Sequence, residues 1–263
     1  MKLCSISSGS EGNCIFVSGK EGKILVDAGI SGKKIEHGLE SIHVSPSSID
    51  GIFVTHEHTD HISGVGVMAR RYHIPIYATV ETMHAMLHGK KIGKVPEELI
   101  HLIKPDNCVQ IKDLQINPFS ISHDAANPVA YTFQSEGHKI GIATDLGDYD
   151  DYIIHNLKET ELLFIEANHD VNMLQVGPYP YLLKQRILGK KGHLSNARSG
   201  KLLCELLHKK LKHVILAHLS KENNFPDLAY QTVRCALEEN GFICKENFLS
   251  VAKFGEPSSV FEI

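Results

Sequence analysis

The sequence lacks several features that would define where a protein acts. No run of 18 apolar residues is present, which argues against a membrane span, and residues 1–8 carry no long apolar stretch, so we expect no signal peptide. The six cysteines form no Cys-x-x-Cys pair, and a chain of 263 residues is far longer than a small disulfide-rich module. We therefore expect a cytoplasmic protein with reduced, mostly buried thiols.

An excess of basic charge is also lacking. The chain has 27 Lys and Arg residues against 31 Asp and Glu residues, a formal net charge of −4 at pH 7. A protein that coats nucleic acid across its whole surface is strongly basic, so that class is excluded. Hydrophobic residues at 42% and charged residues at 22% are ordinary for a folded protein, which excludes disordered and coiled-coil chains.

Neither a low-complexity linker nor a repeat of solenoid length interrupts the chain. Alternating apolar residues between turns predict strands at 2–7, 13–17, 23–27, 51–55, 76–78, 108–111, 114–120, 129–134, 139–144, 161–165 and 213–217. Helical spacing predicts helices at 32–41, 62–72, 80–88, 150–157, 178–188, 196–210 and 226–239. We interpret residues 1–263 as one domain in which two sheets are covered by helices.

Histidine is present in excess, with 17 residues. Three histidines follow the predicted strand 51–55 in the pattern His-x-His-x-Asp-His, formed by His56, His58, Asp60 and His61. Alternation along an extended strand end directs His56 and His58 to the same side. Asp60 and His61 follow in the turn that starts the next helix. Three imidazoles and one carboxylate are ligands that zinc and similar divalent metals prefer, so this segment predicts a metal site.

One short loop cannot enclose two ions, so further ligands are expected at other strand ends. Three more apolar strands end in such a side chain, namely His123, Asp145 and His218. Each of these residues, taken alone, fits a core or loop position as well as it fits a metal-ligand position. As a set they follow the same rule as the first segment, and we include them in the predicted metal site.

These residues, together with an early Asp27 in Leu-Val-Asp-Ala-Gly, resemble the metallo-β-lactamase superfamily. The resemblance implies an α/β fold, the αββα four-layer sandwich, with a dinuclear metal site between its two sheets. The implied ligands of the first ion are His56, His58 and His123. The implied ligands of the second ion are Asp60, His61 and His218. In this assignment Asp145 bridges the two ions.

Two positions indicate which members of the superfamily the chain resembles. Di-iron redox members of the superfamily usually carry a carboxylate at the position of His58, so redox chemistry is not expected. Zinc β-lactamases lack an aspartate at the position of Asp145, which groups the chain with hydrolases of phosphodiesters and thioesters. Residues 7–14, 166–170 and 192–196 resemble more closely the small bacterial family called YycJ, WalJ or VicX. That family is encoded beside a cell-wall-sensing two-component system and is linked to DNA exonuclease activity, which implies a role in DNA repair.

A dinuclear site of this kind supplies its own nucleophile. Two divalent ions about 3.5–4 Å apart share a water, lower its pKa toward neutrality and clamp the attacked group and the leaving oxygen. We expect a metal-bridging hydroxide as the nucleophile. Asp60 is then both a ligand and the residue that orients the hydroxide, which makes it a catalytic residue.

A local basic stretch accompanies the acidic overall charge. Residues 184–201 contain six basic residues and no acidic one. Ser195 or Asn196 is expected to cap the helix that follows, whose first amides form a seat for a phosphate. We interpret the stretch, Arg198 included, as a phosphate-backbone track in which His193 contacts the scissile phosphate or protonates the leaving oxygen. A solvated basic face beside an ordinary helix cap is the alternative.

Three further residues are candidates for substrate contacts. His169 also ends an apolar strand, and it is expected either to orient a metal ligand or to contact the substrate. Ser8 and Asn13 lie on a Gly-rich loop, where they either line the pocket or form a turn.

The leading interpretation is a metal-dependent ester hydrolase, a phosphodiesterase that acts on DNA as a 5′-to-3′ exonuclease. A thioester or small-ester hydrolase of the glyoxalase II type is one alternative, and a regulatory protein that retains the metal site without catalysis is another. Imidazole and carboxylate ligands serve zinc, manganese and iron, so we expect two divalent ions, zinc or manganese, with iron also compatible. DNA is the expected partner, and no membrane contact is expected.

Overall fold

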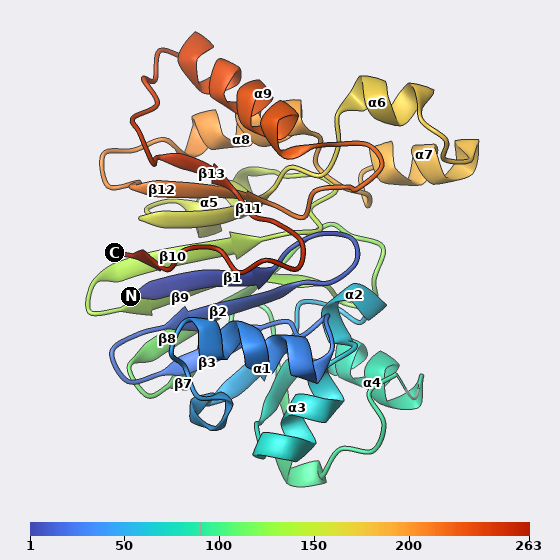
Figure 1. Ribbon diagram of the computed structural model, residues 1–263, viewed down its shortest axis with the longest axis vertical. Helices are drawn as coiled ribbons and strands as arrows, with labels where there is room; N and C mark the ends of the chain where they lie inside the picture. Colours follow the sequence, from blue (N-terminus) through green and yellow to red (C-terminus); the bar gives the residue numbers. More distant parts are fainter. Residues whose placement is uncertain (90) are drawn as a thin grey trace. The chain divides into compact units, whose positions relative to one another are not determined.

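Residues 1–89 and 91–263 are described by the computed structural model (Figure 1). The chain divides into two compact units. Unit 1 comprises Met1–Ser120, Ala125–His138 and Lys253–Ile263, and unit 2 comprises Ile121–Asp124 and Lys139–Ala252. The single domain expected over residues 1–263 stays a prediction. Within the described ranges, no helix combines the length and apolar character that a membrane span requires.

Unit 1 contains a seven-stranded sheet of order β14-β1-β2-β3-β4-β5-β6. Its strands are β1 (Lys2–Ser7), β2 (Cys14–Ser18), β3 (Lys23–Val26), β4 (Gly51–Phe53), β5 (Ile76–Thr79), β6 (Ile100–Ile103) and β14 (Phe261–Glu262). Pairs from β14 to β3 are antiparallel, and pairs from β3 to β6 are parallel. Parallel neighbours need crossover connections, and the helices of unit 1 provide them.

The helices of unit 1 are α1 (Gly32–Ser41), α2 (Thr59–Ile62), α3 (Val65–Tyr72) and α4 (Val80–His88), and two 3-10 turns lie at Pro46–Ser48 and Glu97–Leu99. Helical spacing places Ile35 and Leu39 on one face of α1 and Val65 and Met68 on one face of α3. All four are buried in a single hydrophobic core with strand residues such as Ile52. This packing fixes the position of β4, from which the histidine motif leaves the sheet.

A three-stranded antiparallel meander completes unit 1. Its strands are β7 (Val109–Ile111), β8 (Leu114–Ser120) and β9 (Val129–Ser135). The fully buried Tyr131 on β9 donates its hydroxyl proton to the Val54 carbonyl at 2.7 Å, and its ring meets the edge of Phe53 at 5.8 Å between centroids. The meander is therefore held against the end of β4 and against Val54, two residues before His56 begins the histidine motif.

Asp113, in the turn between β7 and β8, joins the meander to the turn between β2 and β3. Its carboxylate accepts hydrogen bonds of 2.6–3.0 Å from Ser135 Oγ and from the backbone amides of Lys20, Glu21 and Gly22. Partial burial raises the pKa of Asp113, but the hydrogen bonds outweigh burial and hold this pKa well below its usual value.

We expect Asp113→Ala to lower the free energy of unfolding by about 1–3 kcal/mol at pH 7, because three backbone amides, of which that of Gly22 is part-buried, lose a charged acceptor. Since folding lowers the pKa of Asp113, this stabilisation is fully present above the ordinary value of about 3.9 and is lost as the pH falls below it. Urea denaturation at a series of pH values measures the effect, with the exposed Glu98→Ala as control. A difference between wild type and Asp113→Ala that does not shrink between pH 4 and about pH 2 would contradict this account.

Unit 2 contains four parallel strands in the order β10-β11-β12-β13. Its strands are β10 (His138–Ala143), whose first residue still belongs to unit 1, β11 (Leu162–Glu166), β12 (His213–Ala217) and β13 (Leu249–Val251). Its helices are α5 (Asp151–Leu157), α6 (Val171–Val176), α7 (Tyr181–Leu188), α8 (Asn196–Leu206) and α9 (Pro226–Glu239). Because carboxyl ends of parallel strands meet at one edge, Asp145, Glu166 and His218 are brought together there.

Several sequence predictions differ from the structure. The helix predicted at 62–72 is two helices, since the Gly64 amide donates to the Ala28 carbonyl at 2.7 Å and interrupts the helical hydrogen bonding. The short strands β6, β13 and β14 and the helix α6 were not predicted. All six cysteines are free thiols, but Cys4 and Cys14 alone are buried, so the expectation of mostly buried thiols is wrong.

Candidate metal centre

The histidine motif in unit 1 brings its four ligand side chains together. The ring centroids of His56 and His58 lie 4.5 Å apart, and those of His56 and His61 lie 4.1 Å apart. Asp60 Oδ2 lies 3.3 Å from His61 Nε2. His56 and His61 are completely buried, whereas the Asp60 carboxylate is partly exposed. Unit 1 therefore supplies three imidazoles and one carboxylate as a compact ligand group.

Asp27, at the end of β3, orients two of these histidines. Its Oδ2 atom lies 2.7 Å from His61 Nδ1 and 2.9 Å from Thr55 Oγ1, and its Oδ1 atom accepts the Thr55 amide at 2.8 Å. The hydroxyl proton of Thr55 goes to Asp27, so Thr55 Oγ1 accepts from His56 Nδ1 at 3.0 Å. Both rings are thereby held as the tautomer with the lone pair on Nε2, the form in which histidine binds a metal.

Burial and the neighbouring charge shift the pKa of Asp27 in opposite directions. Complete burial raises the pKa of Asp27 above its usual value, and the neighbouring His61 lowers it less than burial raises it. Its backbone has φ 59°, in the left-handed region that aspartate tolerates better than most residues. Such strain at a strand end is a common property of functional sites.

A backbone clamp fixes Asp60. Its carbonyl accepts the Asn13 amide at 2.7 Å, and the Gly29 amide donates to the Asn13 carbonyl at 2.7 Å. A Cβ atom added to Gly29 would lie 1.6 Å from the Asp60 carbonyl oxygen, so glycine alone fits here. The Asn13 side chain is buried and pairs with Gly9 at 3.0 and 3.1 Å. Asn13 thus forms the turn that holds Asp60, and its contact with substrate stays a prediction.

We expect Gly29→Ala to displace the Asp60 loop, because a methyl group cannot share space with the Asp60 carbonyl. The variant should lose about 1–3 kcal/mol of stability and most of its bound metal. Elemental analysis and thermal unfolding measure the two effects. Gly137→Ala is the matched control: it carries a positive φ of 84°, but a Cβ there meets no atom within 4 Å. If Gly29→Ala kept its full metal content, the clamp would have no role in metal binding.

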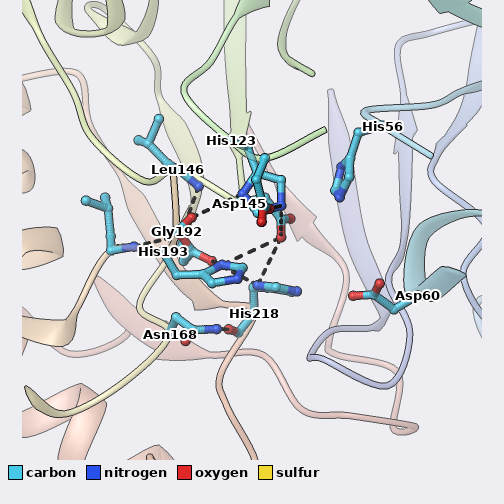
Figure 2. A network of polar contacts seen from close by, with 12 residues as sticks. His56, Asp60, His123, Asp145, Leu146, Asn168, Gly192, His193 and His218 are labelled. Atoms are coloured by element: carbon cyan, nitrogen blue, oxygen red, sulfur yellow. Dashed lines mark hydrogen bonds and ion pairs between the residues drawn. The ribbon is translucent and has the colours of Figure 1, made fainter. Parts of the chain in front are cut away.

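Unit 2 supplies a second ligand group (Figure 2). Ligand atoms of Asp145, Glu166, His193 and His218 all lie within 4.8 Å of one another. His123 Nε2 lies 3.8 Å from Asp145 Oδ1, and its Nδ1 lies 3.1 Å from the Gly192 carbonyl. Burial lowers the pKa of His123, so its imidazole is neutral, as metal binding requires. Asp145 and His218 both have left-handed backbones, with φ 57° and 54°.

Glu166, the last residue of β11, organises this group. Its Oε1 atom lies 2.8 Å from His193 Nδ1 and 2.9 Å from His218 Nδ1. Its Oε2 atom accepts the amides of Leu146 and Leu194 at 2.9 Å each. Complete burial raises the pKa of Glu166, but His193 and His218 outweigh burial and lower it, so the carboxylate is ionised. The acceptor at Nδ1 sets the lone pair of His218 on Nε2.

Sequence reasoning did not select Glu166 as a functional residue. The signal was present, because Glu166 ends an apolar strand in the same way as the predicted ligands do. Its two histidine partners, however, lie 27 and 52 residues further along the chain. That juxtaposition depends on the register of the parallel strands.

His193 differs in its exposure from His123 and His218, the other two histidines of this ligand group. Its side chain is 19% exposed, whereas those of His123 and His218 are 1% and 3% exposed. The His193 amide donates to the Ile187 carbonyl of α7 at 3.0 Å. The residue before it, Gly192, has no room for a Cβ, which would lie 2.1 Å from the same carbonyl. His193 is thus a rigidly held imidazole with access to solvent.

The other predicted substrate contacts have structural partners. Ser195 caps α8, as expected, by accepting the Arg198 amide at 3.3 Å. Asn196 is buried and exchanges two hydrogen bonds with Asn224, at 3.0 and 2.9 Å. Arg198 pairs with Asp148 and lies over the Tyr149 ring at 5.2 Å.

His169 and Ser8 are both buried. Burial lowers the pKa of His169 to about 4, so the ring is neutral at pH 7. Its Nδ1 atom lies 3.3 Å from Asn168 Oδ1, and its Nε2 atom has no hydrogen-bond partner among the described residues. The Ser8 amide donates to the Lys253 carbonyl at 3.1 Å. Roles of these residues in substrate binding stay predictions.

The donor chemistry of both groups fits divalent metal ions. Each group combines imidazoles with carboxylates, the ligands of zinc and manganese sites. Four ring nitrogens, the Nδ1 atoms of His56, His61, His123 and His218, face a hydroxyl, carboxylate or carbonyl oxygen. That pattern is the outer support that metal-binding histidines usually have.

Comparison with known proteins agrees with this chemistry. Residues 23–218 match the family described as the beta-lactamase superfamily domain. The chain is 39% identical over 243 residues to exodeoxyribonuclease YycJ of Bacillus anthracis, covering 92% of this chain and 91% of that protein. It is 40% identical over 232 residues to exodeoxyribonuclease WalJ of Streptococcus pneumoniae serotype 2, covering 88% and 86%.

A solved structure shares the fold. The metallo-β-lactamase fold protein YhfI of Bacillus subtilis superposes with a TM-score of 0.70 over 98% of both chains, at 17% sequence identity. The predicted α/β class and metallo-β-lactamase fold are thereby confirmed. The chain belongs to the β-lactamase superfamily, in the family that contains the exodeoxyribonucleases YycJ and WalJ.

Proposed function

We propose that this protein is a metal-dependent DNA exonuclease that degrades DNA in the 5′-to-3′ direction. The observation that carries the proposal is the Glu166–His193 pair beside Asp145 and His218, an oriented proton donor next to metal ligands. Relatives with 39–40% identity over nearly their whole length bear the name exodeoxyribonuclease, which supports DNA as the substrate. These two relatives favour DNA hydrolysis over the alternative of a thioester hydrolase.

Seven residues would hold two divalent ions, zinc or manganese, with iron also compatible. We propose His56, His58 and His123 for one ion and Asp60, His61 and His218 for the other, with Asp145 shared. This division follows the resemblance to the metallo-β-lactamase superfamily. When bound, the ions would polarise the phosphodiester and activate a water at neutral pH. Asp60 would orient that water.

His193 is the proposed general acid. Glu166 accepts from its Nδ1 atom, so in the imidazolium form His193 would give the Nε2 proton to the leaving 3′ oxygen and be left as the neutral ring. An alkoxide is a poor leaving group, so this proton transfer lowers the barrier where the P–O bond breaks. Arg198, Ser195, Asn196, His169, Ser8 and Asn13 are the proposed substrate contacts or their supports. We expect a cytoplasmic location, where chromosomal DNA is found.

Substrate class and metal can be tested together. Purified protein is analysed for metal content and then incubated, after loading with manganese or zinc, with single-stranded DNA, duplex DNA, RNA and a glutathione thioester. We expect DNA to be degraded fastest and chelation by EDTA to stop the reaction. Thioester cleavage with intact DNA would overturn the nuclease proposal.

A further inference from the structure

The α6–α7 segment of unit 2 exposes apolar side chains that the metal centre does not use. Val176, Tyr181 and Leu182 are 86%, 72% and 80% exposed. None of the eight residues of α7, all of which the structure describes, is buried. Figure 1 shows the two short helices side by side, and Lys184 Nζ of α7 donates to the Gln175 carbonyl of α6 at 2.8 Å. A soluble protein rarely exposes such a patch without a use for it.

The backbone that presents the aromatic residues is stiff. Tyr179 and Tyr181 alternate with Pro178 and Pro180, and proline fixes φ near −65°. Pro180 caps α7 with φ −56° and ψ 148°, an extended polyproline geometry. Ordering a ligand against side chains on such a backbone costs little conformational entropy, because the segment is already ordered.

Charge identifies the kind of ligand that fits. Residues 171–204 contain six basic residues and no acidic one, in a protein of net charge −4. Arg186 pairs with Asp124, and Arg198 pairs with Asp148, whereas Lys190 and Lys191 are exposed just after α7. An aromatic patch inside an acid-free basic segment is complementary to a polyanion with flat apolar faces, which describes single-stranded nucleic acid.

The same helix supports the proposed general acid. The carbonyl of Ile187 in α7 accepts the His193 amide at 3.0 Å, so the segment leads to His193 within a few residues. A strand whose scissile phosphate lies at His193 therefore passes close to α7 and to Lys190 and Lys191, which follow that helix.

We propose that the α6–α7 segment is a stacking platform for unpaired bases of a single-stranded DNA substrate. Tyr181 provides the flat face for a base, Tyr179 and Leu182 border it, and Lys190 and Lys191 neutralise the adjoining phosphates. The inference rests on the proposed function, and it assigns single-stranded rather than duplex DNA to this surface.

The test measures binding without cleavage. Metal-loaded protein is titrated into a fluorescein-labelled 12-nucleotide single strand with phosphorothioate linkages, which resist hydrolysis, and affinity is read by fluorescence anisotropy. Tyr181→Ala should weaken binding by about 5- to 100-fold, the effect of removing one stacked base. Tyr181→Phe, which keeps the flat face, should stay within about twofold of wild type. Tyr152→Ala, at a 37% exposed tyrosine on α5, is the matched control and should not change affinity.

Other outcomes overturn the platform. Equal affinity of Tyr181→Ala and wild type for the single strand would do so, and so would equal weakening of single-stranded and duplex binding. If Tyr181→Ala kept its affinity for DNA but lost self-association, the patch would be a protein-binding surface. If it lost binding to anionic vesicles instead, the patch would be a lipid-binding surface. If wild type cleaves DNA while Tyr181→Ala binds it normally, the platform alone fails. If wild type cleaves no DNA, the proposed function fails.

Discussion

Replacing His193 by alanine is expected to reduce the rate of DNA cleavage by about 10²- to 10⁴-fold, the range for loss of a general acid. The leaving 3′ oxygen would then depart without the proton that His193 Nε2 supplies. Metal content should not change, since Asp145 and His218 keep their places. Initial rates on DNA at saturating substrate, with elemental analysis of both proteins, measure the effect.

A substrate with a better leaving group separates proton donation from a structural role. p-Nitrophenolate leaves without protonation, so cleavage of a p-nitrophenyl phosphodiester of thymidine by His193→Ala should fall by less than about 10-fold. His155→Ala, at an exposed histidine of α5, serves as the matched control for both substrates. An equal loss on both substrates would contradict the assignment of His193 as general acid.

Replacing Asp145 by alanine is expected to lower metal affinity by at least about 100-fold and to abolish DNA cleavage. Loss of an outer partner of a ligand already costs about 10- to 100-fold in metal affinity, and Asp145 is proposed to contact both ions itself. The Asp145 carboxylate is 2% exposed and lies 3.6–3.8 Å from ring nitrogens of His123, His193 and His218. Metal titration with a competing chelator measures the affinity.

The matched control for Asp145 is Asp227→Ala, at an exposed aspartate in the first turn of α9. It should bind metal as wild type does. Circular dichroism before and after metal addition separates loss of the ion from loss of the fold. If Asp145→Ala were folded, retained both ions at wild-type affinity and cleaved DNA normally, the proposed ligand set would be wrong.

The parts of the site that were predictable from the sequence lie close together in the chain. His56, His58, Asp60 and His61 follow one strand within six residues, and the structure brings their side chains together. The helices at 32–41 and 226–239 were also predictable, since each has an uninterrupted helical pattern of apolar residues.

What could not be predicted depends on distant pairing. Glu166 meets His193 and His218 because β11 and β12 pair in a parallel register that sets Glu166 beside Ala217. The strand β14 exists because Phe261 pairs with Leu3 across almost the whole chain. Short elements such as these have too few residues to show a period, so tertiary contacts decide them.

The roles of Asn13 and Gly29 could not be predicted from the sequence either. The Gly-rich loop around Asn13 was consistent with a pocket wall or with a turn. In the structure the asparagine forms the turn, and its amide holds the Asp60 carbonyl. Local sequence shows that a loop is polar and flexible in composition, but it does not show which carbonyl lies opposite it.

The central claim is that this chain hydrolyses DNA with the help of bound metal and proceeds from the 5′ end. The most direct measurement is a time course of degradation of one 5′-phosphorylated DNA strand, labelled either at its 5′ end or at its 3′ end. Wild type and Asp145→Ala are compared. Each protein is assayed with metal bound, after the metal is removed and after it is restored. We predict that wild type releases the 5′ label at once as a mononucleotide while the 3′-labelled strand shortens gradually. Chelation of the metal should stop both changes, and Asp145→Ala should neither release the 5′ label nor shorten the 3′-labelled strand. DNA that stays intact with metal-loaded wild type, or that is degraded equally by Asp145→Ala, would contradict it.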